Sequence, residues 1–218
     1  MDRPRIGRPA WGWLLSSWML LLPFTGCASA LATAMWVIKG TNVESEYDGL
    51  KEKRVAVVCR QLASLAYRDS TVPRDLATQV GNLLSTNVTK IRIIDQQDVA
   101  QWTDENAWED FTEIGKALEA DMVVGIELED FRLHQGQTLY QGRANVHIKV
   151  YDLKDGGKLV FDKPAPQAVY PPNTGIPTSD KQEPQFRREF VLVLAEDIAR
   201  RFYAHDSHVN FARDSAAF

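Results

Sequence analysis

The residues with the greatest capacity for acid–base or metal chemistry are two histidines near a group of carboxylates. His134 and His147 lie in segments with strand-like patterns, and Glu127, Glu129 and Asp130 precede them. Such side chains catalyse reactions or bind metal when they converge in a cleft. The chain has no Glu-x-x-His or His-x-x-x-His spacing to support a helical metal site. We therefore interpret these residues as a solvated sheet face, and expect no metal, no cofactor and no catalytic residue.

The run His205-Asp206-Ser207-His208 also has the residue types of a hydrolytic site. It follows the last expected helix, where a histidine interacts favourably with the helix dipole. No Gly-x-Ser-x-Gly elbow and no glycine-rich phosphate loop occurs in the chain. The sequence thus predicts a protein that is not an enzyme.

The amino terminus has the composition of an export signal. Three arginines in residues 1–8 precede an uncharged run from Pro9 to Ile38. The most apolar part, Trp11 to Phe24, has the length of a signal-peptide core. The next residues, Thr25-Gly26-Cys27, resemble the lipobox of bacterial lipoproteins, in which the cysteine receives the lipid and becomes the new amino terminus. Cys27 is therefore the expected site of lipid attachment, and the membrane anchor would be its acyl chains, palmitate among them.

Two alternatives to lipidation remain open. Residues 9–38 exceed the roughly 20 residues that span a bilayer, so they could stay as a membrane anchor, and simple secretion is the third possibility. Cys59, the other cysteine, ends an apolar strand pattern and is interpreted as a buried small hydrophobe. A Cys27–Cys59 disulfide would require an unlipidated Cys27. All three readings of the amino terminus export the domain to the periplasmic side of a membrane.

The elements that follow predict an α/β (α+β) domain with a single mixed sheet and helices packed on it, in the order β-α-β-α-α-β-β-β-α. The apolar run Arg54–Cys59 is typical of a strand covered on both faces. Strict alternation from Tyr140 to Val150 predicts an antiparallel strand with one polar face. The expected organisation is a signal peptide at 1–26 (or an anchor at 9–38), a tether at 27–53, a globular domain at 54–206 with a proline-rich loop at 164–184, and a tail at 207–218.

Two surfaces are candidates for binding. The polar face of the alternating strand carries Arg143, His147 and Lys149. In a protein of net charge −4, such a local cationic face could meet an anionic partner. The proline-rich loop presents Tyr170, and long loops on compact domains are often functional. The acidic composition disfavours a nucleic-acid partner.

Several motifs occur in an order that resembles a known superfamily. They are KRVAVV (53–58), IRIIDQQDVAQW (91–102) and IGKALEADMVVGIELEDF (114–131). They resemble the envelope-lipoprotein superfamily of the curli secretion channel, the penicillin-binding-protein activator lipoproteins and the amino-terminal domain of TolB. Family members usually have Gly-Ala-Asp where this chain has Glu119-Ala120-Asp121. The long membrane-inserting hairpins of the curli channel are not evident, so its pore role is not carried over.

The resemblance implies a periplasmic adaptor that docks onto envelope machinery. We therefore expect a non-catalytic, membrane-anchored accessory lipoprotein of the cell envelope, facing the periplasm and binding a protein partner in transport, secretion or cell-wall assembly. An enzyme with a noncanonical site on the polar strand face, and a self-associating structural protein of the envelope, are the alternatives.

Overall fold

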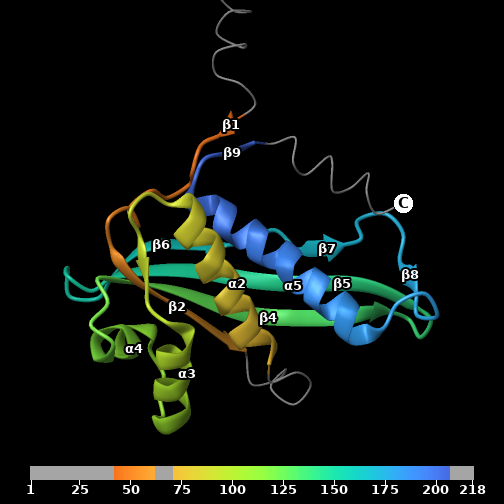
Figure 1. The fold of residues 1–218 in the computed structure, drawn as a ribbon, viewed down its shortest axis with the longest axis horizontal. Coiled ribbons are helices and arrows are strands. Elements are labelled where there is room, and N and C mark those ends of the chain that lie inside the picture. The colour runs from red at the N-terminus through yellow and green to blue at the C-terminus, as the bar shows by residue number, and fades with distance from the viewer. Residues whose placement is uncertain (1–41, 62–70, 207–218) are drawn as a thin grey trace, which may run out of the picture. The chain divides into compact units, whose positions relative to one another are not determined.

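The computed structural model describes residues 42–61 and 71–206 (Figure 1). Cys27, the expected signal peptide or anchor, and the expected tail lie outside these residues. The described elements are β1 (Asn42–Val43), β2 (Arg54–Gln61), α2 (Val72–Asn87), β3 (Arg92–Ile93), α3 (Gln96–Glu105), α4 (Phe111–Ala117), β4 (Met122–Gln135), β5 (Leu139–Asp152), β6 (Lys158–Pro164), β7 (Ala168–Tyr170), β8 (Ile176–Pro177), α5 (Glu183–Ala199), a 3-10 turn (Arg200–Phe202) and β9 (His205–Asp206). Within the described ranges, no helix has the length and apolarity needed to cross a membrane.

The main sheet is mixed, which confirms the predicted fold class. Its strands lie in the order β3-β2-β4-β5-β6. Strand β2 is parallel to both β3 and β4, whereas β4-β5 and β5-β6 are antiparallel hairpins. The short strands β1 and β9 pair with each other in a separate two-stranded sheet.

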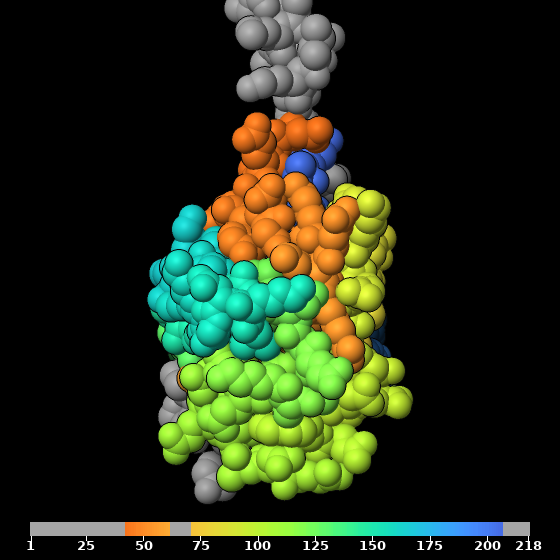
Figure 2. Space-filling model, turned by 90° about the vertical axis from the view of Figure 1, so that its left-hand side faces the viewer, coloured from red at the N-terminus to blue at the C-terminus, as the bar shows by residue number. Residues whose placement is uncertain are grey.

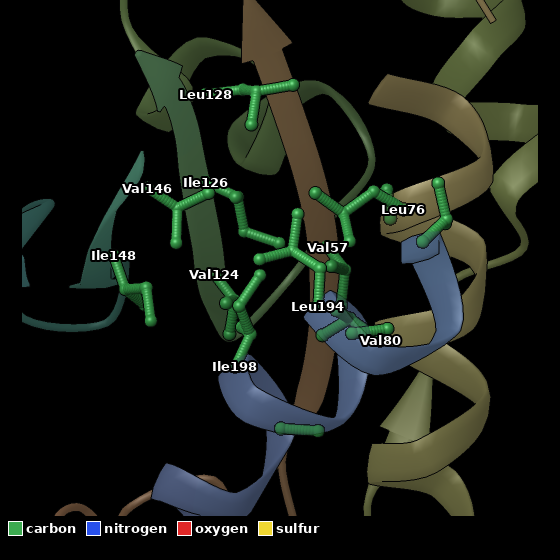
Figure 3. Close-up of a cluster of buried hydrophobic side chains, with 14 of the residues drawn as sticks. Val57, Leu76, Val80, Val124, Ile126, Leu128, Val146, Ile148, Leu194 and Ile198 are labelled. Carbon is green, nitrogen blue, oxygen red and sulfur yellow. The ribbon is translucent and has the colours of Figure 1, made fainter. Parts of the chain in front are cut away.

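One face of the sheet carries the larger part of the core. Helices α2 and α5 cross it side by side (Figure 1). The alternate residues Val57, Val124, Ile126 and Ile148 point toward these helices, where they meet Leu76 and Val80 of α2 and Leu194 and Ile198 of α5 (Figure 3). All eight of these side chains are fully buried. Burying a Val, Leu or Ile side chain contributes about 1.5–3 kcal/mol, so this layer supplies most of the driving force for folding.

A smaller apolar cluster lies on the opposite face. The residues of β2 and β4 that point away from α2 and α5, Ala56, Val58 and Val123, are covered by Phe111 and Ile114 of α4. The close approach requires Gly125, because a Cβ at this position would lie 2.8 Å from the Phe111 ring. Both faces of β2 are therefore buried, as its uninterrupted apolar sequence predicts.

Two of the helices begin with a capping side chain. Asp95 caps α3 by accepting a hydrogen bond from the Gln97 amide at 2.8 Å. Asp110 caps α4 and forms a reciprocal capping box with Glu113. Thr71 occupies the cap position of α2, but its side chain makes no capping hydrogen bond.

Strand β4 contains a bulge that the alternation of its first half does not show. Leu128 pairs with Val146, and the register shifts before Asp130 pairs with Asn145. The extra residue, Glu129, lets Phe131 and Leu133 face the same core as Leu128. The two consecutive polar residues between Leu128 and Phe131 are the sequence signal of this shift.

Part of the expected tether lies against the domain. Leu50 is fully buried, and Tyr47 packs against the larger core. The amides of Glu46 and Tyr47 both donate to the Arg201 carbonyl, at 2.8 and 3.0 Å. Figure 2 shows residues 43–53 (orange) lying on the domain surface. The apolar spacing of this segment is too sparse for a periodic pattern, which is why its packing was not evident from the sequence.

The proline-rich segment is more regular than the sequence predicts. Two short strands within it, β7 and β8, pair with the first half of β5. Together with β6, they pair along the same edge of β5 one after another, and residues 165–167 and 171–175 connect the three strands. The segment is thus held along the sheet over much of its length.

Candidate functional site

The candidate site is the part of the second sheet face that no described helix covers. We call it the polar sheet face, and define it by residues of β2, β4, β5 and β6: Arg60, Glu127, Glu129, Arg143, Asn145, His147, Lys149 and Asp162. Helices α3 and α4 cover the neighbouring part of the same face, over β2 and the start of β4. As the alternation of β5 predicts, Arg143, His147 and Lys149 share this side of the strand, opposite Ala144, Val146 and Ile148.

Glu127 is the centre of the polar sheet face. Its side chain is only 11% exposed, yet it is charged and contacts two cations. Lys149 Nζ lies 2.8 Å from one carboxylate oxygen, and the Arg60 guanidinium donates to the other. A buried carboxylate is tolerated only when its oxygens are paired in this way.

The electrostatics of this group keep all three charges in place. Burial alone would raise the pKa of Glu127, but the hydrogen bonds from Lys149 and Arg60, together with their charges, lower it below its ordinary value. The hydrogen bond to Glu127 in turn raises the pKa of Lys149. Glu127 therefore stays ionised at neutral pH and is poorly suited to act as a general acid.

Arg60 links this charge cluster to α4. Its guanidinium lies 4.8 Å from the centre of the Phe111 ring, and it also donates to the Glu109 carbonyl at 2.7 Å. Its Nε atom is buried and has no hydrogen-bond partner among the described residues. The Arg60 side chain thus lies at the border between the part of the sheet face that α4 covers and the part that no described helix covers.

His147 brings a second set of charges together. Its Nε2 atom lies 2.5 Å from Asp162 of β6, and its Nδ1 atom lies 3.8 Å from Glu129. The imidazole and two carboxylates therefore converge, which the sequence interpretation did not predict. The side chains are open to solvent, with 27%, 45% and 46% exposed for His147, Asp162 and Glu129. The cavity described below, beside the end of β2, is not lined by these residues.

The other two candidate binding residues have structural contacts. Arg143 donates to the Gln141 side chain at 2.9 Å and remains half-buried on the polar sheet face. Tyr170 pairs through its backbone with Gly142, and its ring stacks on Phe186 with centroids 6.1 Å apart. Tyr170 thus secures the proline-rich segment to α5 and leaves part of its ring at the surface.

The histidines do not form one site. His134 pairs with Tyr140 near the tip of the β4-β5 hairpin, far along the strand from His147, which pairs with Glu127. His205 belongs to β9. Among the described residues, no group of three His, Cys, Asp or Glu side chains has the arrangement of a metal site. The expected absence of a metal stays a prediction for the whole chain.

Comparison with known proteins gives similarities of fold. No protein-family model and no curated protein matches the chain. A PelC dodecamer variant from Paraburkholderia phytofirmans matches with a TM-score of 0.46 and 12% identity, over 74% of this chain and 96% of that one. The lipoprotein GNA1162 from Neisseria meningitidis matches with a TM-score of 0.41 and 13% identity, over 67% and 98%. A minor lipoprotein from Acinetobacter baumannii matches with a TM-score of 0.35 and 15% identity, over 74% and 95%.

Two of these neighbours are bacterial lipoproteins. The similarity is too low to place this chain among them.

Arg60 and Asp162 are the members of the polar sheet face that sequence analysis missed. Arg60 directly follows the apolar run of β2, in a position that looks like the start of a loop. Asp162 reaches His147 only because of the β5-β6 register, in which it lies opposite Lys149. The sequence contains one indication of the position of Asp162. It directly follows the core residue Phe161 in β6, so the alternation of a strand turns its side chain to the opposite, polar face.

Proposed function

We propose that the protein is a non-catalytic accessory protein of the bacterial cell envelope, anchored to a membrane through lipid on Cys27. Its domain faces the periplasm and binds a protein partner through the polar sheet face. The observation that carries the proposal is the part of the sheet face that no described helix covers, where charged side chains from four strands are held in fixed positions by one another.

The arrangement of charges favours binding over catalysis. Glu127, Lys149 and Arg60 satisfy one another, so none of them is poised to exchange a proton with a substrate. A rigid, mixed-sign surface of this kind gives orientation and partner selectivity through complementary charges. The rim charges Arg143 and Glu129 remain accessible and are suited to the first encounter with a partner.

The anchoring proposal rests on the amino-terminal sequence. A basic region, an apolar run and Thr25-Gly26-Cys27 occur in that order. The described domain begins close behind, since Tyr47 and Leu50 already pack on the core. With lipid on Cys27, fewer than twenty residues would separate the membrane from the domain, which would hold the polar sheet face close to membrane-bound partners.

Intact mass spectrometry of the membrane-extracted protein tests the anchor. A wild-type mass for a chain starting at Cys27 plus acyl groups, absent in Cys27→Ser, is the expected result. A full-length, unmodified mass would mean that residues 9–38 span the membrane and that Cys27 carries no lipid. A cleaved, unacylated and soluble chain would mean that the protein has no membrane anchor.

One observation favours a second candidate function. His147 with Asp162 and Glu129 has the composition of an acid–base group, and a histidine oriented by a carboxylate is a common catalytic arrangement. Its position on open surface rather than in a cleft weighs against it, because catalytic groups need a site that excludes water. If the cluster only binds, His147→Gln preserves function in cells lacking the native gene, since glutamine keeps the hydrogen bonds but cannot act as an acid or a base. Complete loss of function in a folded His147→Gln protein would favour the enzyme.

A further inference from the structure

A second site is indicated by the connections of the three parallel strands. The chain leaves β2 for α2, which covers one face of the sheet, and returns to β3 at the edge. It then leaves β3 for α3 and α4, which cover the opposite face, and returns to β4 on the other side of β2. In open α/β sheets, ligands bind outside the carboxyl ends of the strands, at the point where successive connections leave in opposite directions.

A cavity lies at this point in the structure. It has a volume of about 600 Å³. Its walls come from β2, the first two turns of α2, and α3 along its length. Figure 1 shows α2 and α3 leaving the sheet in different directions. Small-ligand pockets usually measure about 300–1,000 Å³, so the cavity has room for one or two sugar rings.

The floor and one wall of the cavity are apolar. Val57, Val58 and Val99 form part of its base. Trp108 lines it with a half-buried indole, which is fixed against Phe111 at a centroid separation of 5.7 Å. An indole face combines a large apolar surface with one hydrogen-bond donor at its edge. It suits the C–H face of a flat, polar ring.

The remaining wall carries groups that both donate and accept hydrogen bonds. They are the amides of Gln96 and Gln97 and the hydroxyls of Thr78 and Thr103. The Thr78 and Thr103 hydroxyls donate to helix carbonyls, and Gln96 donates to the Val57 carbonyl at 3.1 Å. Their acceptor oxygens are therefore oriented, and the exposed Gln97 side chain adds donors. Hydroxyl groups on a ligand, which also donate and accept, match such a wall.

The charged groups at the cavity argue against an ionic ligand. Arg74 of α2 and Asp104 of α3 pair with each other across it. Asp95 is engaged as the cap of α3. An anion would need unpaired donors and a cation unpaired carboxylates, whereas the charges here already have partners.

We propose that this crevice binds a neutral saccharide of one or two rings, with a ring face on Trp108 and hydroxyls on Gln96 and Gln97. The proposal is independent of the proposed function, because none of these residues belongs to the polar sheet face.

The test is calorimetric titration of the detergent-solubilised full-length protein with cellobiose, maltose and N,N′-diacetylchitobiose. At least one probe is expected to bind saturably. Binding should be at least threefold weaker in Gln97→Ala and unchanged in Gln101→Ala, an exposed glutamine of the same helix outside the cavity. Trp108→Leu should abolish it, with the circular dichroism spectrum confirming the fold.

Three results would overturn the proposal. One is the absence of saturable binding by all three probes at concentrations on the order of 10 mM, where even weak ligands are detected. Another is equal binding by Gln97→Ala and Gln101→Ala. Saturable binding of inorganic phosphate without binding of any sugar would also reject a neutral ligand. None of these outcomes changes the result expected from mass spectrometry of the anchored protein, so the two proposals can fail separately.

Discussion

The ammonium group of Lys149 lies 2.8 Å from the carboxylate of Glu127, across the two antiparallel strands at the centre of the sheet. Arg60 binds the other carboxylate oxygen. The three side chains form a charged cluster at the edge of the smaller apolar cluster beneath α4. Side chains that are mostly buried must be satisfied by each other, so the cluster fixes the polar sheet face as a rigid surface.

Glu127→Gln should destabilise the domain by about 3 kcal/mol, since removing one partner leaves Arg60 and Lys149 without their counter-charge. Urea unfolding followed by circular dichroism measures the change. The matched control is Glu129→Gln, whose parent side chain is 46% exposed and should change stability by well under 1 kcal/mol. Equal effects of the two substitutions would show that the cluster is not structural.

Stability should fall at acid pH through two carboxylates. The pKa of Glu127 is lowered in the fold, against the effect of burial, by Lys149 and Arg60, and that of Asp121 by the Arg54 amide and Lys154. A lowered folded pKa means that the unfolded chain takes up protons first. The stabilisation is thus complete above the ordinary values of 4.5 and 3.8, and is lost as pH falls below them.

The free energy of unfolding, measured from pH 7 to pH 3, checks this expectation. The wild type should show little loss from these groups above about pH 5 and a steep loss below it. The slope should be shallower in Asp121→Asn, which cannot titrate at this position. An unchanged slope in that variant would contradict the assigned role of Asp121.

Glu119→Gly should stabilise the domain modestly. Glu119 has a φ of 53°, in the left-handed region that costs a residue with a side chain about 1 kcal/mol or more. Glycine adopts this conformation freely. A rise in Tm of a few degrees is expected. Gln101→Gly, at an exposed position inside α3, should lower the Tm instead, and a fall in both variants would refute the strain at Glu119.

Cys59 should react slowly with thiol reagents in the folded protein. Burial raises the pKa of its thiol, so little thiolate is present even at pH 8. Its side chain also packs against the larger core. Labelling with a maleimide, followed by mass spectrometry, should be slow in buffer and fast in urea. Rapid labelling of the native protein would reveal an activated thiol rather than a small core residue.

Much of the fold could be predicted because its strands have two clear signatures. The unbroken apolar run of β2 indicates a strand buried on both faces, and the alternation of β5 places Arg143, His147 and Lys149 together. The convergence of His147 with Asp162 could not be predicted, because it depends on the β5-β6 register, which shifts between Val150 and Tyr151. The buried position of Glu127 depends likewise on α4 and Arg60, which the sequence alone does not place beside it.

The proline-rich segment shows the same limit. Its composition predicts a loop, and a count of prolines does not show that the free edge of β5 would pair with Ala168–Tyr170. Pairing with a distant strand outweighed local propensity there. Tyr170, predicted as a binding residue from its place in a loop, has Phe186 as its main neighbour for that reason.

Site-specific photo-crosslinking in living cells tests most directly whether the polar sheet face binds a partner. A photoreactive amino acid in place of Arg143 reports on that face, and one in place of Ser85, exposed on α2, serves as the control. We predict a discrete adduct of one additional envelope protein from position 143, and none from position 85. No adduct from position 143, or the same adducts from both positions, would contradict the account.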